Sequence, residues 1–121
     1  MKNKKTVVIG VSEKPGRYAN IAVSRLLQYG HEVVPIGQKK GTIQNLEILT
    51  GQPDIKDVHT ITMYVRPENQ KGMYDYLLSL KPERIIFNPG TENEELERLA
   101  HAAGIEAIEG CTLVMLSIGN Y

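Results

Sequence analysis

The sequence predicts an α/β domain in three layers, with five or six mostly parallel strands between helices. Short, β-branched apolar segments alternate along the chain with segments whose apolar residues recur at helical spacing. Glycine or proline separates most of these segments. Strands that alternate with helices form parallel sheets joined by right-handed crossovers, which is the Rossmann-like arrangement. The 121 residues are enough for one such domain, and we expect residues 1–121 to form it.

The first half of the chain predicts two strands and a helix. Lys5–Ile9 is β-branched and almost wholly apolar, which is typical of a strand buried on both faces. The apolar residues of 21–27 recur at helical spacing, and Gly30 supplies a stop for that helix. His31–Ile36 is the second predicted strand. The pattern of 37–57 is the least regular, and it admits one short strand, at 46–48.

The second half predicts a longer strand, a helix and another strand. Val58–Val65 is rich in β-branched and aromatic residues and predicts a strand. Pro67 suits the first position of a helix, whose apolar residues recur at steps of four and three until Pro82 ends it. Arg84–Phe87 predicts the next buried strand.

The clearest helix start in the sequence follows the turn after that strand. Thr91 and Glu94 have the spacing of a capping box. In that motif the Thr91 hydroxyl accepts from the third amide, and the Glu94 carboxylate accepts from the amide of Thr91. Gly104 closes this helix. A last short strand is predicted at Ile105–Ile108 and a final helix at Cys111–Ile118.

Composition and charge exclude several classes of protein. The 14 basic residues balance the 14 acidic ones, so a non-specific nucleic-acid partner is not expected. One cysteine cannot form an internal disulfide, which fits a reducing compartment. No apolar run is long enough for a signal-peptide core or a membrane span. We therefore expect a soluble, cytoplasmic protein with no membrane partner.

Four loops are expected at one edge of the predicted sheet, and each contains glycine or proline. Ligands of such folds bind beyond the carboxyl ends of the strands, where the strand order reverses. The loops that follow strands are Gly10–Ala19, Gly37–Gly41, Val65–Pro67 and Asn88–Thr91. This edge is the candidate ligand site.

The first of these loops has features of a phosphate site. Gly10 permits a tight turn, and Ser12 offers a hydroxyl and an amide beside the amino end of a helix, which attracts anions. Lys14 and Arg17 add positive charge. The loop departs from the G-x-G-x-x-G pattern, and the alternative is an ordinary strand-to-helix turn. Its place in the fold favours phosphate binding.

The second loop distinguishes between nucleotides. An NAD site needs an acidic residue at the end of the second strand, to accept from the ribose hydroxyls. That strand is followed instead by Lys39 and Lys40. The loop therefore favours NADP or coenzyme A, each of which has a phosphorylated adenosine ribose, over NAD. The other reading of these two lysines is a solvated loop.

Several motifs, in order along the chain, resemble those of the CoA-binding domain family. That family includes small stand-alone bacterial proteins and the N-terminal domain of the succinyl-CoA synthetase alpha subunit. The resemblance covers nearly the whole chain. The segments that carry it are Val8–Ser12, Lys14–Arg17, Gly30–Ile36 and Asn88–Glu95.

The resemblance implies that coenzyme A or an acyl-CoA is the cofactor. Gly10, Ser12 and Arg17 would line the phosphate loop, and Lys39 would meet the ribose phosphate. Residues 65–67 and 89–90 would flank the adenine or pantetheine end. The full set of expected cofactor-binding residues is Gly10, Val11, Ser12, Lys14, Arg17, Tyr18, Ile36, Gly37, Lys39, Lys40, Val65, Arg66, Pro67, Pro89 and Gly90.

The sequence contains no convincing catalytic or metal-binding set. Cys111 falls at the expected ligand edge, but no histidine lies near it in sequence, and the three histidines lack metal-ligand spacing. We therefore expect binding without catalysis by this chain. Two alternatives stay open: an NADP-binding or redox-related protein, and an interaction or regulatory module that has lost nucleotide binding. A homodimer or a partner enzyme is compatible with each.

Overall fold

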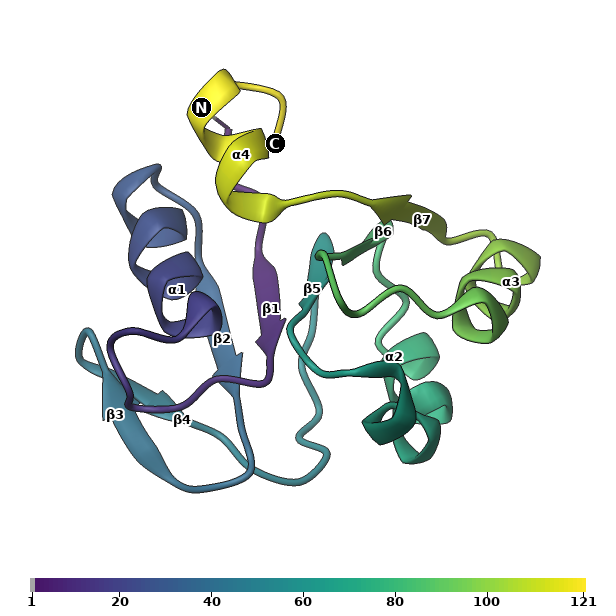
Figure 1. Ribbon diagram of the computed structural model, residues 1–121, viewed down its shortest axis with the longest axis horizontal. Helices are drawn as coiled ribbons and strands as arrows, with labels where there is room; N and C mark the ends of the chain where they lie inside the picture. The colour runs from purple at the N-terminus through teal and green to yellow at the C-terminus, as the bar shows by residue number, and fades with distance from the viewer. Residues whose placement is uncertain (1) are drawn as a thin grey trace.

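The centre of the protein is a parallel five-stranded sheet (Figure 1). The computed structural model describes residues 2–121. The strand order is β2-β1-β5-β6-β7, and every neighbouring pair is parallel. The bounds are β1 Thr6–Ile9, β2 Val33–Ile36, β5 Thr60–Met63, β6 Arg84–Phe87 and β7 Glu106–Glu109. The predicted fold class is confirmed, with five strands in the parallel sheet.

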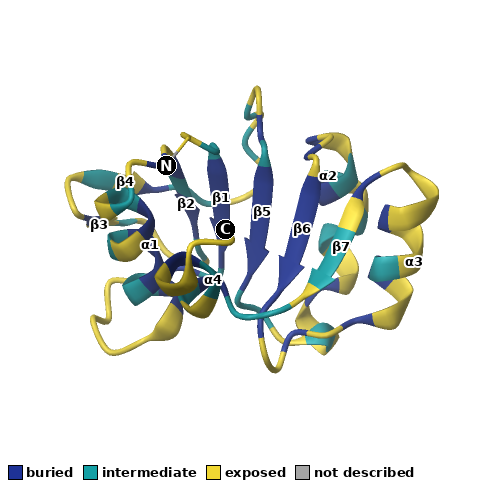
Figure 2. Cartoon of the chain, turned by 90° about the horizontal axis from the view of Figure 1, so that it is seen from above, coloured by how far each residue is buried: buried dark blue, intermediate teal, exposed yellow. Residues whose placement is uncertain are grey.

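Helices cover both faces of this sheet and complete the three layers (Figures 1 and 2). Val8 and Ile86 pack in a core cluster with residues of α1 and α4. Their neighbours Val7 and Ile85 pack in a second cluster with residues of α2 and α3. Successive strand residues therefore serve opposite faces, as the period of a β-strand requires. The bounds of the helices are α1 Tyr18–Gln28, α2 Tyr74–Ser79, α3 Glu94–Ala102 and α4 Thr112–Ile118.

The strand order reverses at β1. The chain passes from β1 to β2 on one side, and it later returns to place β5 on the other side. The loops that follow β1, β2, β5 and β6 therefore meet at one edge, which is the usual position of a ligand site in such folds.

A β-hairpin extends from the outer side of β2. It consists of β3 Gly41–Ile43 and β4 Leu46–Ile48, which pair antiparallel. Two residues with positive φ, at positions 44 and 45, form the tight turn between them. The amide of Leu49 then donates to the carbonyl of Pro35, which fixes the hairpin to the sheet. The sequence predicted β4 but not β3.

Several strands and helices have bounds that differ from the predicted ones. β2 begins at Val33, two residues after the predicted start, and β5 is shorter than the predicted 58–65. The predicted helix from Pro67 is instead two 3-10 turns, η1 Pro67–Asn69 and η2 Lys71–Met73, followed by the short α2. Pro67 does occupy a first helical position, but the turn it starts is a 3-10 turn.

The predicted cap of α3 is wrong by two residues. Asn93 is the N-cap, and its side-chain oxygen accepts from the amide of Leu96 at 3.1 Å. Glu97 reaches back to the amide of Asn93, also at 3.1 Å. Thr91 is not available as a cap because its hydroxyl donates to the carbonyl of Asn88 in the preceding turn.

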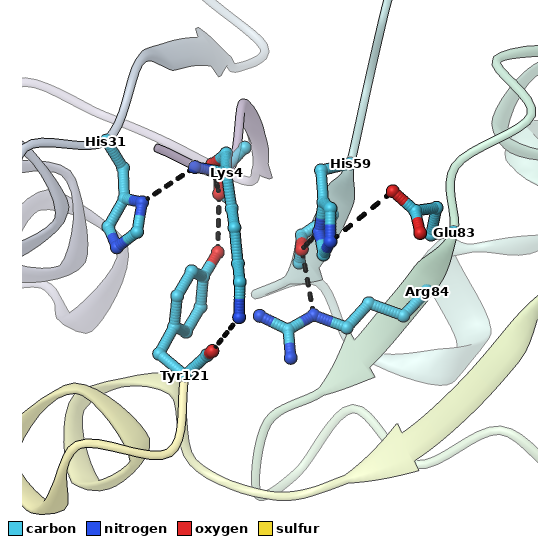
Figure 3. Close-up of polar contacts among 8 residues, drawn as sticks. Lys4, His31, His59, Glu83, Arg84 and Tyr121 are labelled. Atoms are coloured by element: carbon cyan, nitrogen blue, oxygen red, sulfur yellow. Dashed lines mark hydrogen bonds and ion pairs between the residues drawn. The ribbon is translucent and has the colours of Figure 1, made fainter. Parts of the chain in front are cut away.

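A polar network joins the two ends of the described chain at the amino edge of the sheet (Figure 3). The side chain of Lys4 donates to the carbonyl of Tyr121, and the hydroxyls of Tyr121 and Thr6 share a hydrogen bond. The Arg84 guanidinium lies 4.5 Å from the centre of the Tyr121 ring. These contacts hold the segment after α4 against the start of β1.

His31 is part of this network in its neutral form. Its Nδ1 accepts a hydrogen bond of 2.9 Å from the amide of Lys4, and the residue is buried. Burial lowers the pKa of His31, and the positive charges of Lys4, Arg84 and His59 lower it further. Burial likewise lowers the pKa of His59, although Glu83 opposes that shift.

We expect the protein to lose stability as the pH falls from 7 to 5. The ordinary pKa of histidine is 6.5, and the folded value is lower. The unfolded chain therefore takes up more protons below pH 6.5, so the free energy of unfolding is greatest above that pH and decreases below it. Thermal unfolding across this range measures the effect. His31→Gln should reduce the dependence on pH, whereas His101→Gln, on the exposed end of α3, should not. Equal pH profiles of wild type and His31→Gln would contradict the assignment.

Candidate functional site

A cleft of about 790 Å³ lies at the carboxyl edge of the sheet, around the loops that follow β1, β2, β5 and β6. This volume is in the range of small-molecule sites, about 300–1,000 Å³. The lining residues are Gly10, Val11, Ser12, Glu13, Lys14, Arg17, Tyr18, Ala19, Gln38, Lys39, Lys40, Tyr64, Val65, Arg66, Asn69, Pro89, Gly90 and Thr91.

Most of the residues that the sequence singled out come together in this cleft. Ser12 and Arg17, from the loop after β1, share it with Lys39, from the loop after β2. Of the fifteen expected cofactor-binding residues, only Ile36, Gly37 and Pro67 are absent from the lining. Pro67 is set back from the cleft at the start of η1. The other two lie beneath the first loop.

Ile36 and Gly37 support the first loop instead of facing the cleft. The carbonyl of Ile36 accepts from the amides of both Gly10 and Val11, each at 2.9 Å. A Cβ atom at Gly37 would lie 2.0 Å from the carbonyl oxygen of Val11, so only glycine permits this approach. The first loop therefore lies directly on the end of β2.

This packing changes which amides are available to a ligand. The amides of Gly10 and Val11 are already bonded to Ile36. The first amides of α1 have no helical carbonyl to bond, and the N-cap residue Arg17 makes no side-chain capping bond. The free amides at the amino end of α1, where the helix has a partial positive charge, are thus better placed to donate hydrogen bonds to an anion.

Positive charge is concentrated in the cleft although the net charge of the whole chain is zero. Five lining side chains are basic, and Glu13 is the single acidic one. All five basic residues are exposed, and none forms an ion pair within residues 2–121. Such an arrangement attracts a multiply charged anion. The five are Lys14, Arg17, Lys39, Lys40 and Arg66.

Two tyrosines give the cleft aromatic surface. Tyr18, the first residue of α1, is 72% exposed, which is unusual for a large aromatic side chain. Its ring is a flat surface against which a planar heterocycle can pack. Tyr64 lies deeper, and its hydroxyl is buried without a hydrogen-bond partner among the described residues. Burial raises the pKa of Tyr64 well above its usual range, so the phenol stays neutral.

Asn88 braces the protein beneath the cleft. Its side-chain amide donates to the hydroxyl of Thr62 at 2.7 Å and to the carbonyl of Met63 at 2.8 Å. Its side-chain oxygen accepts from the amide of Thr112 at 2.8 Å. One buried side chain therefore joins the ends of β5 and β6 to the start of α4.

Six lining residues were not among the sequence candidates. Tyr64 directly follows β5 at the predicted edge, so its position could have been found from the strand end. Glu13 and Gln38 lie inside loops that were predicted, but nothing in the sequence distinguished them from solvated residues. The other three are Ala19, Asn69 and Thr91.

Cys111 is the N-cap residue of α4 and is half-buried at the carboxyl edge, where it was expected. It does not line the cleft, and neither does any histidine. Across residues 2–121, no three acidic, histidine or cysteine side chains are grouped as metal ligands would be. In the same span, no helix has the length and apolar character needed to cross a membrane.

Fold and site together define a Rossmann-like α/β domain with a cationic cleft where the strand order reverses. Residues 4–117 match the family described as CoA binding domain. The chain belongs to this family, which confirms the resemblance seen in its motifs. No curated protein matches the chain.

Solved structures share the fold. The chain is 50% identical, over the full length of both chains and with a TM-score of 0.98, to a protein described as uncharacterized. A Thermus thermophilus protein is 20% identical, with 98% of this chain and 91% of that one covered and a TM-score of 0.86. An acetyl-coenzyme A synthetase of Ca. Korarchaeum cryptofilum, in complex with phosphate and ADP, is 24% identical with a TM-score of 0.72. That match covers 88% of this chain but 25% of the synthetase.

Proposed function

We propose that this chain binds coenzyme A or an acyl-CoA in the cleft, without catalysing a reaction by itself. The observation that carries the proposal is the meeting of five basic side chains and the amino end of α1 in one cleft. The chain's family is a CoA binding domain family, and coenzyme A is a polyanion with a planar adenine. Charge and shape of the cleft match those two properties.

The parts of the ligand divide between the loops. The pyrophosphate lies at the amino end of α1, beside Ser12 and Arg17. Lys39 faces the ribose phosphate. The adenine packs near Tyr18. Charge-assisted contacts contribute about 1.5–3 kcal/mol each against association costs of at least ~4 kcal/mol, which suggests a Kd of about 1 µM.

Calorimetry with the intact chain tests the proposal. We expect heat of binding with coenzyme A and with acetyl-CoA, and weaker binding of NAD. Tighter binding of NADP than of coenzyme A would favour the alternative of an NADP-binding protein. Lys39 and Lys40 are compatible with that alternative as well. Absence of binding to every nucleotide would overturn the proposal and favour an interaction module.

Loss of the Lys39 ammonium group is expected to weaken coenzyme A binding about 10- to 100-fold, since the ribose phosphate loses a charged partner. Lys39→Ala and wild type are compared by calorimetry with coenzyme A and with dephospho-CoA, which lacks that phosphate. The substitution should not change the affinity for dephospho-CoA. Lys71→Ala, a lysine outside the cleft lining, is the control and should bind as wild type does. Equal affinities of wild type for the two ligands would reject the role of Lys39.

A further inference from the structure

Glu13 is the single acidic residue of the cleft lining, which is unexpected in a site for a polyanion. Its carboxylate does not pair with any of the neighbouring lysines or arginines. Instead, Oε2 accepts a hydrogen bond of 2.9 Å from the amide of Thr42, on strand β3 of the hairpin. The carboxylate is therefore held by the backbone of β3 and leaves the cationic side chains without an ion-pair partner.

Gly41 permits this contact. A Cβ atom at that position would lie 2.5 Å from Cδ of Glu13 and 2.8 Å from its Oε2. Glu13 therefore lies flat against the backbone of residues 41–42, in a space that any side chain at 41 would fill. The missing Cβ and the hydrogen bond are two separate signs of one close contact.

The contact fixes one end of the segment that contains the cleft lysines. Lys39 and Lys40 directly precede Gly41. At the other end of this segment, Gly37 packs against the carbonyl oxygen of Val11. Residues 38–40 are thus fixed to the first loop at both ends, and the two lysines are held on the same cleft as Ser12 and Arg17.

We propose that Glu13 is a positioning and specificity residue that holds Lys39 and Lys40 over the part of the ligand that contains the ribose phosphate. The inference rests on the proposed function. Without the Glu13 contact, Gly41 still pairs with Ile48 in the hairpin, but the lysine segment is fixed to the first loop only at Gly37. Ordering the segment against that loop on binding then costs conformational entropy. The carboxylate acts through the lysines, so its effect should appear only with ligands that have this phosphate.

Two substitutions of Glu13 separate positioning from charge. Glu13→Gln keeps an oxygen that accepts from the Thr42 amide but removes the negative charge, whereas Glu13→Ala removes both. We expect Glu13→Gln to bind coenzyme A within about twofold of wild type, and Glu13→Ala to bind about five- to tenfold more weakly. Both should bind dephospho-CoA as wild type does. Combined with Lys39→Ala, Glu13→Ala should add little further loss.

The outcomes are distinct. Failure of wild type to bind coenzyme A would overturn the proposed function and this inference with it. If wild type binds but Glu13→Ala binds equally well, only the role of Glu13 is overturned. An equal loss for coenzyme A and dephospho-CoA also overturns it, because a general weakening of the loop would affect both ligands. Hydrogen exchange of the Thr42 amide, faster in Glu13→Ala than in Glu13→Gln, reports the contact without any ligand.

Discussion

Asn88→Ala is expected to lower the free energy of unfolding by about 3–5 kcal/mol. The side chain is 2% exposed and makes three hydrogen bonds, to Thr62, Met63 and Thr112. Alanine cannot replace any of them, and it leaves a buried amide and a buried carbonyl without this partner. Each unsatisfied buried group costs about 1–3 kcal/mol. Denaturant unfolding, monitored by circular dichroism, measures the loss.

Asn120→Ala provides the matched control, because that asparagine is exposed near the end of the described chain. We expect its free energy of unfolding to stay within about 0.5 kcal/mol of wild type. The assignment of Asn88 as a structural brace would be wrong if both variants lost the same small amount. Because Asn88 connects the strand ends that lie beneath the cleft, its loss should also weaken coenzyme A binding.

The sequence predicted the sheet well because its central strands are apolar on both faces. β1, β5 and β6 are buried along their whole length, and apart from Arg84 at the start of β6 each consists of apolar or β-branched residues. β3 gave no such signal. Its three residues are largely half-buried or exposed, and its turn has positive φ at residues 44 and 45 without a glycine. The pairing with β4, rather than local preference, makes it a strand.

Competition between side chains explains the wrong cap of α3. Thr91 and Asn93 are both good N-cap residues by type. In the turn after β6, the Thr91 hydroxyl already donates to the carbonyl of Asn88. The next suitable residue, Asn93, is therefore the N-cap. A hydrogen bond to a turn that is itself fixed by tertiary contacts is not visible in local sequence.

Charge and loop position predicted much of the cleft, but not how its loops pack. Lysines and arginines in loops after parallel strands must lie at one edge, so Arg17 and Lys39 could be placed there from sequence. Which residues face the cleft and which support it depends on contacts between loops. Ile36 was expected to face the ligand, yet its carbonyl supports the first loop. Glu13 resembled a solvated residue, yet it bonds the hairpin.

Gly37→Ala is expected to destabilise the protein by about 3 kcal/mol, or roughly 10 °C in Tm. The added Cβ would lie 2.0 Å from the carbonyl oxygen of Val11 and 3.2 Å from Cγ2 of Ile48. The nearer contact is with backbone, which cannot rotate away as a side chain does. The first loop or the end of β2 must therefore move, and the hydrogen bonds from Gly10 and Val11 to Ile36 weaken with it.

The same substitution should weaken coenzyme A binding about tenfold. The displaced first loop is one wall of the cleft, and the segment that contains Lys39 and Lys40 begins at Gly37. Gly16→Ala is the matched control in that loop, since no atom lies within 4 Å of an added Cβ there. We expect Gly16→Ala to keep both the Tm and the affinity of wild type. A Gly37→Ala protein with unchanged Tm would show that the first loop does not rest on β2. One that is destabilised but binds normally would show that the position of this loop does not determine affinity.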